Sequence, residues 1–314
     1  MILSKRFLYV LLTAVTAVIV GYPHTAWSQA PTVTQGVQQM NIFQALVLGF
    51  IQGATEFLPI SSTAHLKVIP VILGWGDPGV AFTAIIQLGS IVAVIWYFWG
   101  DLTGIVKGAM GEDLEERNFN RRLGLGIILG TLPIVFFGLL IKKFIPDFDN
   151  SPIRSIGAIA IASIVMSLLL GLAEILGKRQ RDFNKLTMTD GILMGLAQSM
   201  ALVPGVSRSG STLTAGLFMG LKRETAARFS FLLGIPAITL AGLVELKDVL
   251  GNITSGEILP LVVGVVSAGI FSYIAIAGLL RFLKTQSNWV FVWYRLAFGT
   301  AILSAIAAGM LKNS

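Results

Sequence analysis

Two short polar segments interrupt long apolar stretches of the sequence, and their residue types suit phosphate chemistry. Glu56 is one of only three formally charged residues between positions 42 and 98, and Arg208 is the only one between positions 192 and 220. Ionisable residues inside apolar, membrane-type sequence are functional candidates by default. The chemistry of this chain is therefore expected around Glu56 and Arg208.

The second polar segment, residues 204–212, reads PGVSRSGST and combines one guanidinium with four hydroxyl groups and two glycines. A guanidinium binds phosphate through two parallel hydrogen bonds, and backbone N–H groups at a helix N-terminus favour anions. The segment therefore predicts a phosphate-binding loop centred on Arg208. The alternative is that its Ser and Thr residues only form hydrogen bonds between helices.

The first polar segment contains Gln52 and Glu56, four residues apart on one face of a predicted helix. Oxygen ligands suit Mg²⁺ or Ca²⁺, and Mg²⁺ is usually held by one or two carboxylates together with substrate phosphates and water. We predict a divalent cation at Glu56, with Gln52 as a weaker ligand. The alternatives are an interhelical hydrogen bond for Gln52 and a structural ion pair between Glu56 and Arg208.

Three hydroxyl residues, Ser61 to Thr63, follow the break at Pro59, and His65 comes within one helical turn of them. A hydroxyl nucleophile beside an imidazole is a plausible catalytic pair. Helix capping by serine and a packing role for His65 are the alternative. The spacing leaves open whether a serine, the histidine or an activated water attacks phosphorus.

The elements that must position these residues are membrane helices. The chain of 314 residues is 54% hydrophobic and 12% charged, with a mean hydropathy of +0.80, whereas soluble domains carry about 25% charge. Six apolar stretches approach the ~20 residues that a membrane span needs; they are Val80–Trp99, Leu123–Ile141, Ile153–Leu176, Ala226–Leu246, Ile258–Leu280 and Trp289–Met310. The net charge of +7 is scattered over short loops, so a nucleic-acid partner is not expected. The absence of cysteine excludes disulfides and thiolate metal sites.

Each polar segment lies between two apolar pieces that are too short to span a membrane, and Pro59 and Pro204–Gly205 break the helix there. This pattern predicts two re-entrant hairpins, because irregular backbone at membrane depth is tolerated only inside protein or beside a watery cavity. An offset of 146 residues aligns Ser61 with Ser207 and Gln52 with Gln198. The offset indicates two related halves. With three spanning helices and one hairpin in each half, the second half must enter the membrane from the opposite face, so we predict two inverted repeats whose hairpin tips share one cavity, an arrangement used by transporters.

Basic residues concentrate in the segments 100–122 and 177–186, which the positive-inside rule places in the cytoplasm. The first hairpin then enters from the extracytoplasmic side. At the N-terminus, Lys5 and Arg6 precede an apolar run and small residues near Ser28, as in a secretory signal peptide. An uncleaved extra helix is the alternative.

The stretches QGATEFLPISSTAHL and PGVSRSGST resemble the two signature motifs of the undecaprenyl-diphosphate phosphatase family, also called bacitracin resistance proteins. The likeness covers about residues 40–311, and IQLGSIVAV and FSFLLGIP also resemble family sequence. It implies an integral enzyme of the bacterial plasma (inner) membrane, open to the extracytoplasmic face. Such an enzyme hydrolyses undecaprenyl diphosphate to undecaprenyl phosphate and inorganic phosphate, which recycles the lipid carrier for peptidoglycan synthesis. Bacitracin competes for the same lipid.

The resemblance also assigns roles to residues. Glu56 would bind the divalent cation, Ser62 and His65 would be nucleophile and proton-transfer group, and Arg208 would hold phosphate oxygens. The hydroxyl residues of the phosphate site would be Ser61, Ser207, Ser209 and Thr212. The family pattern has Glu or Gln at the position of Gln52, so this chain depends on Glu56 for its carboxylate.

The predicted fold is an all-α polytopic membrane protein of two inverted repeats, each with one re-entrant helical hairpin and three transmembrane helices. Residues 1–39 form the signal peptide or extra helix with a short linker, and residues 40–311 form one membrane domain, with repeats at about 40–177 and 186–311. A polyprenyl-phosphate transporter or flippase and a lipid-binding scaffold without turnover are the rival functions. The sequence does not determine the oligomeric state, and a homodimer is one possible state.

Overall fold

The computed structural model describes residues 40–145, 148, 151–250 and 258–313, and these form helices joined by loops, with one isolated bridge between Arg181 and Leu221. The prediction of a signal peptide or extra helix falls on residues 1–39, outside the described residues. The helical class predicted from hydropathy is confirmed for the described part of the chain.

Both polar segments lie in the loops of short helical hairpins. Helix α2 (Ile42–Glu56) is followed by α3 (Ser62–Ile72), and α8 (Met188–Ser199) is followed by α9 (Arg208–Phe218). The capping box of Asn41 and Gln44 starts α2. Helix α9 begins at Arg208, earlier than its apolar run at Leu213, because Ser207 accepts a hydrogen bond from the Gly210 amide and caps the helix.

Helix α8 begins outside the membrane-spanning segments, and contacts among Thr187, Asp190 and Arg181 fix its first turn. Thr187 and Asp190 form a capping box, and Arg181 donates to the Asp190 carboxylate. That hydrogen bond raises the pKa of the Arg181 guanidinium above its ordinary value. The loop before the second hairpin is therefore tied to its first helical turn.

The predicted spans correspond to the long helices. These are α4 (Gly79–Tyr97) with α5 (Trp99–Gly108), α6 (Leu114–Phe144), α7 (Ile156–Leu176), α10 (Arg223–Leu250), α11 (Ile258–Leu283) and α12 (Trp289–Ala307). Five helices of the described part are long and apolar enough to cross a membrane, and the pair α4–α5, bent by 56°, makes up to six. Large apolar side chains such as Trp96, Phe136 and Trp293 are exposed on them, as expected for lipid-facing surfaces. The chain is a multi-pass membrane protein.

Each hairpin packs closely against a long helix from the other half of the sequence. A Cβ atom on Gly49 of α2 would lie 2.3 Å from the Gly264 carbonyl oxygen of α11, and one on Gly195 of α8 would lie 2.0 Å from the Gly130 carbonyl oxygen of α6. Small residues permit such close approach of membrane helices. The hairpin of each half is thereby held in place by a long helix of the other half.

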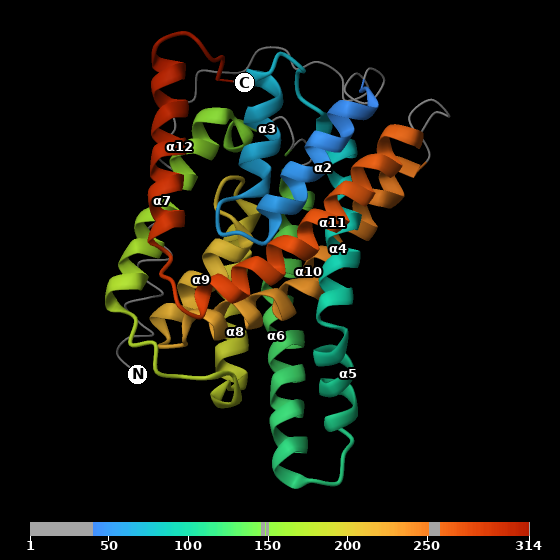
Figure 1. Cartoon of the computed structure of the whole chain (residues 1–314), viewed down its shortest axis with the longest axis vertical. Helices are drawn as coiled ribbons and strands as arrows, with labels where there is room; N and C mark the ends of the chain where they lie inside the picture. Colours follow the sequence, from blue (N-terminus) through green and yellow to red (C-terminus); the bar gives the residue numbers. More distant parts are fainter. Residues whose placement is uncertain (1–39, 146–147, 149–150, 251–257, 314) are drawn as a thin grey trace.

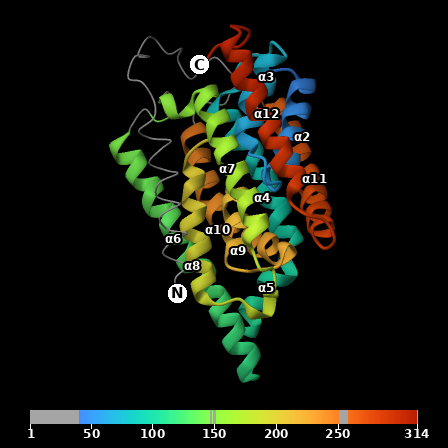
Figure 2. The same cartoon turned by 90° about the vertical axis from the view of Figure 1, so that its left-hand side faces the viewer.

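The hairpins approach the middle of the molecule from different ends. In Figure 1, α2 and α3 lie toward the upper end, α8 lies toward the lower end, and the connection between α5 and α6 projects beyond the other helices at the bottom. Figure 2 shows the same lower projection after a quarter turn. The two loops meet between these ends, where the Ser209 hydroxyl donates to the Leu58 carbonyl oxygen at 2.9 Å.

Candidate active site

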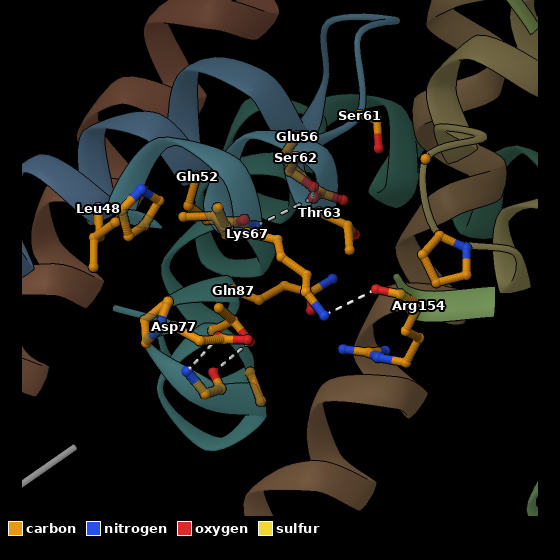
Figure 3. Close-up of a pocket in the computed structure, with 18 of the residues that line it drawn as sticks. Leu48, Gln52, Glu56, Ser61, Ser62, Thr63, Lys67, Asp77, Gln87 and Arg154 are labelled. Atoms are coloured by element: carbon orange, nitrogen blue, oxygen red, sulfur yellow. Dashed lines mark hydrogen bonds between the residues drawn. The ribbon is translucent and has the colours of Figure 1, made fainter. Parts of the chain in front are cut away.

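A cavity of about 810 Å³ leads to the two hairpin loops. Its inner wall includes Gln52, Glu56, Ser62 and Arg208, and its outer wall includes the segment from Gly74 to Gly79. Figure 3 shows Gln52, Glu56, Ser62 and Thr63 gathered on one side of this cavity, with the Lys67 side chain extending toward Arg154. The predicted meeting of both polar segments at one cavity is confirmed.

The two loops have matching backbone conformations at their serines. Ser61 has φ 74° and ψ 100°, and Ser207 has φ 73° and ψ 115°. Both side chains cap the following helix, Ser61 by accepting from the Ala64 amide and Ser207 by accepting from the Gly210 amide. A positive φ at a non-glycine residue costs about 1–3 kcal/mol and is commonly kept at functional sites. Ser61 and Ser207 therefore mark two strained loops that the surrounding contacts must hold.

Glu56 is the centre of the polar contacts at the inner end of the cavity. Its Oε2 atom accepts a hydrogen bond from the Ser62 hydroxyl at 2.7 Å and another from Gln52 Nε2 at 3.2 Å. Its Oε1 atom lies 3.7 Å from Nη2 of Arg208, which comes from the other hairpin. The carboxylate is therefore in position both to accept a proton from Ser62 and to offset the charge of Arg208.

Arg208 is buried at the cavity wall, and its side chain contacts residues from both halves of the sequence. Its guanidinium lies over the Phe57 ring at 5.9 Å, and Nη1 donates to the Ser230 carbonyl oxygen at 3.4 Å. Gly234 makes room for it, because a Cβ atom there would lie 1.9 Å from Nη1. Within the described part of the chain, Nε and Nη2 make no hydrogen bond. Both atoms are buried beside the cavity, and guanidinium N–H groups without a hydrogen bond are donors of the kind that bind anionic oxygens.

The remaining hydroxyl groups of the predicted phosphate site divide into two groups. Ser61 and Ser207 line the cavity. Ser209 donates across to the first hairpin, and Thr212 bonds the Arg208 carbonyl oxygen at 2.8 Å and the Ser230 hydroxyl at 2.5 Å. Neither Ser209 nor Thr212 belongs to the described residues that line the cavity. Their direct contact with phosphate stays a prediction, and in this geometry they support the loop.

His65 is turned away from Ser62. Its Nδ1 atom lies 2.7 Å from the Ser61 carbonyl oxygen, its Nε2 atom lies 2.6 Å from the Tyr294 hydroxyl, and its ring stacks on Phe298. Both ring nitrogens therefore have partners other than Ser62, and His65 is not among the described residues that line the cavity. This arrangement matches the packing alternative more closely than a proton-transfer role.

Two further residues near the loops were missed by the sequence analysis. Tyr294 and Arg295, both on α12, contact the first hairpin through His65 and the Pro59 carbonyl oxygen. Arg295 carries the same signal that singled out Arg208, since it is an ionisable residue inside a predicted span. Tyr294 has no comparable signal, because aromatic residues are common in membrane helices.

The residues at Glu56 fit a divalent cation only in part. No cluster of three His, Cys, Asp or Glu side chains occurs among the residues that the structure describes. Glu56 is the one carboxylate at the inner end of the cavity, with the Gln52 amide and the Ser62 hydroxyl beside it. Such a donor set suits a cation that the diphosphate group of a substrate helps to bind, and it is too small for a cage made of protein alone.

Comparisons with known proteins identify a family and several relatives. The model of the family described as "Bacitracin resistance protein BacA" matches residues 45–301. A protein of Trichormus variabilis named undecaprenyl-diphosphatase is 72% identical over the full length of both chains. Proteins of the same name from a Synechocystis strain and from Trichodesmium erythraeum are 65% and 62% identical, covering 86% and 88% of this chain and 84% and 90% of their own lengths.

Proposed function

The chain belongs to the bacitracin resistance protein BacA family, and we propose that it hydrolyses undecaprenyl diphosphate to undecaprenyl phosphate and inorganic phosphate. The observation that carries this proposal is the meeting of Ser62, Glu56 and Arg208 from two hairpins at one cavity. A nucleophile, a carboxylate and a guanidinium are the groups that phosphoryl transfer needs for attack, proton acceptance and charge stabilisation. The names of relatives that are 56–72% identical support the same reaction.

In the proposed reaction, the Ser62 oxygen attacks the terminal phosphorus while its proton passes to Glu56. The bond from that phosphorus to the bridging oxygen breaks, undecaprenyl phosphate leaves, and Arg208 stabilises the negative charge on the phosphoryl oxygens. Glu56 passes the proton it has taken to the departing phosphate group of undecaprenyl phosphate, which restores the carboxylate. Glu56 then takes a proton from a water molecule whose oxygen attacks the phosphoryl group on Ser62, and it returns this proton to the Ser62 oxygen as the Ser62 O–P bond breaks and inorganic phosphate leaves. The hydrogen bond of 2.7 Å from Ser62 to Glu56 favours this route over attack by His65, whose nitrogens are bonded elsewhere.

We propose Mg²⁺ or Ca²⁺ as the cofactor, held by Glu56 and, more weakly, by Gln52 together with the substrate diphosphate. Such a cation would offset charge on phosphoryl oxygens. The isoprenoid tail would remain among the apolar helices, so no water-filled pocket for the lipid is needed. Both hairpin loops come from one chain, so the reaction needs no second copy, and a homodimer stays a prediction.

We also propose that the halves are inverted repeats with the cavity open to the extracytoplasmic face of the bacterial plasma membrane. Helix α2 of the first half packs on α11 of the second, and α8 of the second half packs on α6 of the first. This reciprocal packing supports an inverted repeat. The cavity lining includes Trp75, which follows α3. In Figure 1, α3 lies toward the upper end, whereas α5, which falls in the basic segment 100–122, lies toward the lower end. Substrate would therefore enter at the face where the lipid diphosphate is released from cell-wall synthesis.

Phosphate release tests the proposal directly. Purified protein in lipid nanodiscs, given undecaprenyl diphosphate and Mg²⁺ or Ca²⁺, is expected to release inorganic phosphate. A Lys107→Met variant, changed on exposed α5 away from the cavity, is expected to match the wild type. Correctly folded protein that releases no phosphate with any divalent cation would refute the enzyme, and movement of intact diphosphate across the bilayer would then favour the transporter.

Bacitracin resistance follows from the same proposal. Bacitracin binds the lipid diphosphate, so an enzyme that converts this lipid lowers the amount the antibiotic can capture. Expression of the wild-type chain in a bacitracin-sensitive bacterium is expected to raise the inhibitory concentration, and expression of Glu56→Gln at the same membrane level is not.

A further inference from the structure

The guanidinium of Arg295 joins the two hairpin loops at equivalent positions. Nη1 donates to the Pro59 carbonyl oxygen at 2.9 Å, and Nη2 donates to the Gly205 carbonyl oxygen at 2.8 Å. The offset between Pro59 and Gly205 is 146 residues, the same offset that relates Ser61 to Ser207. One planar side chain therefore binds the same point of both loops, two residues before each serine with positive φ.

Two further backbone carbonyl groups accept hydrogen bonds from the Arg295 guanidinium. Nη2 also donates to the Val206 carbonyl oxygen at 3.1 Å, and Nε donates to the Ser163 carbonyl oxygen of α7 at 3.1 Å. The side chain is 1% exposed. Because arginine offers five N–H donors in a fixed fork, it can bind several carbonyl groups at once, which a lysine ammonium cannot do with the same planar geometry.

These contacts matter because the reacting groups come from different loops. Ser62 and Glu56 belong to the first hairpin and Arg208 belongs to the second, and the Glu56–Arg208 contact is already long at 3.7 Å. A shift between the loops would therefore separate the carboxylate from the guanidinium. Apart from that contact and the bonds to Arg295, the described residues hydrogen-bond directly from one loop to the other through the Ser209 hydroxyl and the Leu58 carbonyl oxygen.

We propose that Arg295 is a positioning residue that holds the two hairpin loops together as one rigid body. It keeps Ser61 and Ser207 in their strained conformations and thereby sets Ser62 and Glu56 against Arg208. The inference builds on the proposed hydrolysis. It also predicts that the site works without moving the two halves apart, in contrast to a transporter whose repeats rock around a central site.

Hydrogen exchange and kinetics of Arg295 variants test this role. In Arg295→Met, amide exchange is expected to rise together in peptides that cover residues 57–66 and 203–212, with the long helices still protected. The kcat for phosphate release is expected to fall about 100-fold, since a misplacement of about 1 Å can cost that much, while KM changes less than threefold. Arg281→Met, an exposed change on α11, serves as the matched control and is expected to behave as the wild type.

Two results for Arg295→Met would contradict the positioning role. Wild-type exchange in both loops and a wild-type kcat in Arg295→Met would overturn the proposal. So would increased exchange in all helices with an unchanged kcat per folded molecule, since that pattern describes a general stability role. If Arg295→Met does not fold, Arg295→Lys decides, and it is expected to show the same loosening of both loops to a smaller extent. If the wild type releases no phosphate, the proposed hydrolysis fails, and the exchange measurement still decides whether Arg295 joins the loops.

Discussion

The Ser62 hydroxyl donates a hydrogen bond of 2.7 Å to Glu56, across the break that separates α2 from α3. The helix ends after Glu56 and the next one begins at Ser62, so the turn brings the two side chains together although they are six residues apart. Helix geometry alone pairs residues three or four apart. The loop itself therefore creates the arrangement of the proposed nucleophile and base.

Glu56→Gln and Ser62→Ala are each expected to lower kcat by about 10²–10⁴-fold, because each removes one partner of a proton transfer. The double variant is expected to be no worse than the poorer single variant, since the two residues act as a unit. Phosphate release from undecaprenyl diphosphate, normalised to folded protein, checks this. Losses that multiply in the double variant would show that the two residues act separately.

Gly234→Ala is expected to inactivate the protein without removing any functional group. The added Cβ atom would lie 1.9 Å from Nη1 of Arg208, so the flexible guanidinium must move while the backbone keeps its place. We expect at least about a 100-fold loss of kcat/KM with little change in thermal stability. Gly278→Ala on α11, where a Cβ atom would meet no atom within 4 Å, is the matched control. Full activity in Gly234→Ala would contradict the placement of Arg208.

Tyr294→Phe is expected to lower stability more than activity. It leaves Nε2 of the buried His65 without its bond of 2.6 Å, which costs about 1–3 kcal/mol. We expect both Tyr294→Phe and His65→Gln to keep kcat within about tenfold of the wild type. Unfolding and phosphate release, measured on the same preparations, separate the two effects. A kcat loss of about 10²–10⁴ in stable His65→Gln protein would restore His65 as the proton-transfer group.

Ser61→Gly is expected to be more stable than Ser61→Ala, although both lose the capping hydroxyl. Alanine keeps the strain of φ 74°, whereas glycine adopts positive φ without it, a difference of about 1–2 kcal/mol. The same order is expected for Ser207, with φ 73°. Denaturation of the four variants in one detergent checks it. An alanine variant as stable as its glycine counterpart would show that the loop conformation is not strained.

The sequence by itself determined the membrane class, the position of the hairpin loops and part of the cavity lining. Long apolar stretches predict spans because backbone polar groups in lipid must be satisfied within helices. Pro59 and the Pro204–Gly205 pair end helices through local backbone chemistry, and the structure places loops at both. The resemblance to known motifs then selected Glu56, Ser62 and Arg208, which all line one cavity.

Only the tertiary structure decided which partner each side chain has. His65 is one turn from Ser62 in sequence, yet it bonds Tyr294, which is 229 residues away. Arg295 reaches the Pro59 and Gly205 carbonyl groups across 236 and 90 residues. Hydropathy and helix breaks are local properties that a sequence displays directly. Hydrogen-bond partners depend on how distant helices pack, so the roles of His65 and Arg295 emerge only after the chain has folded.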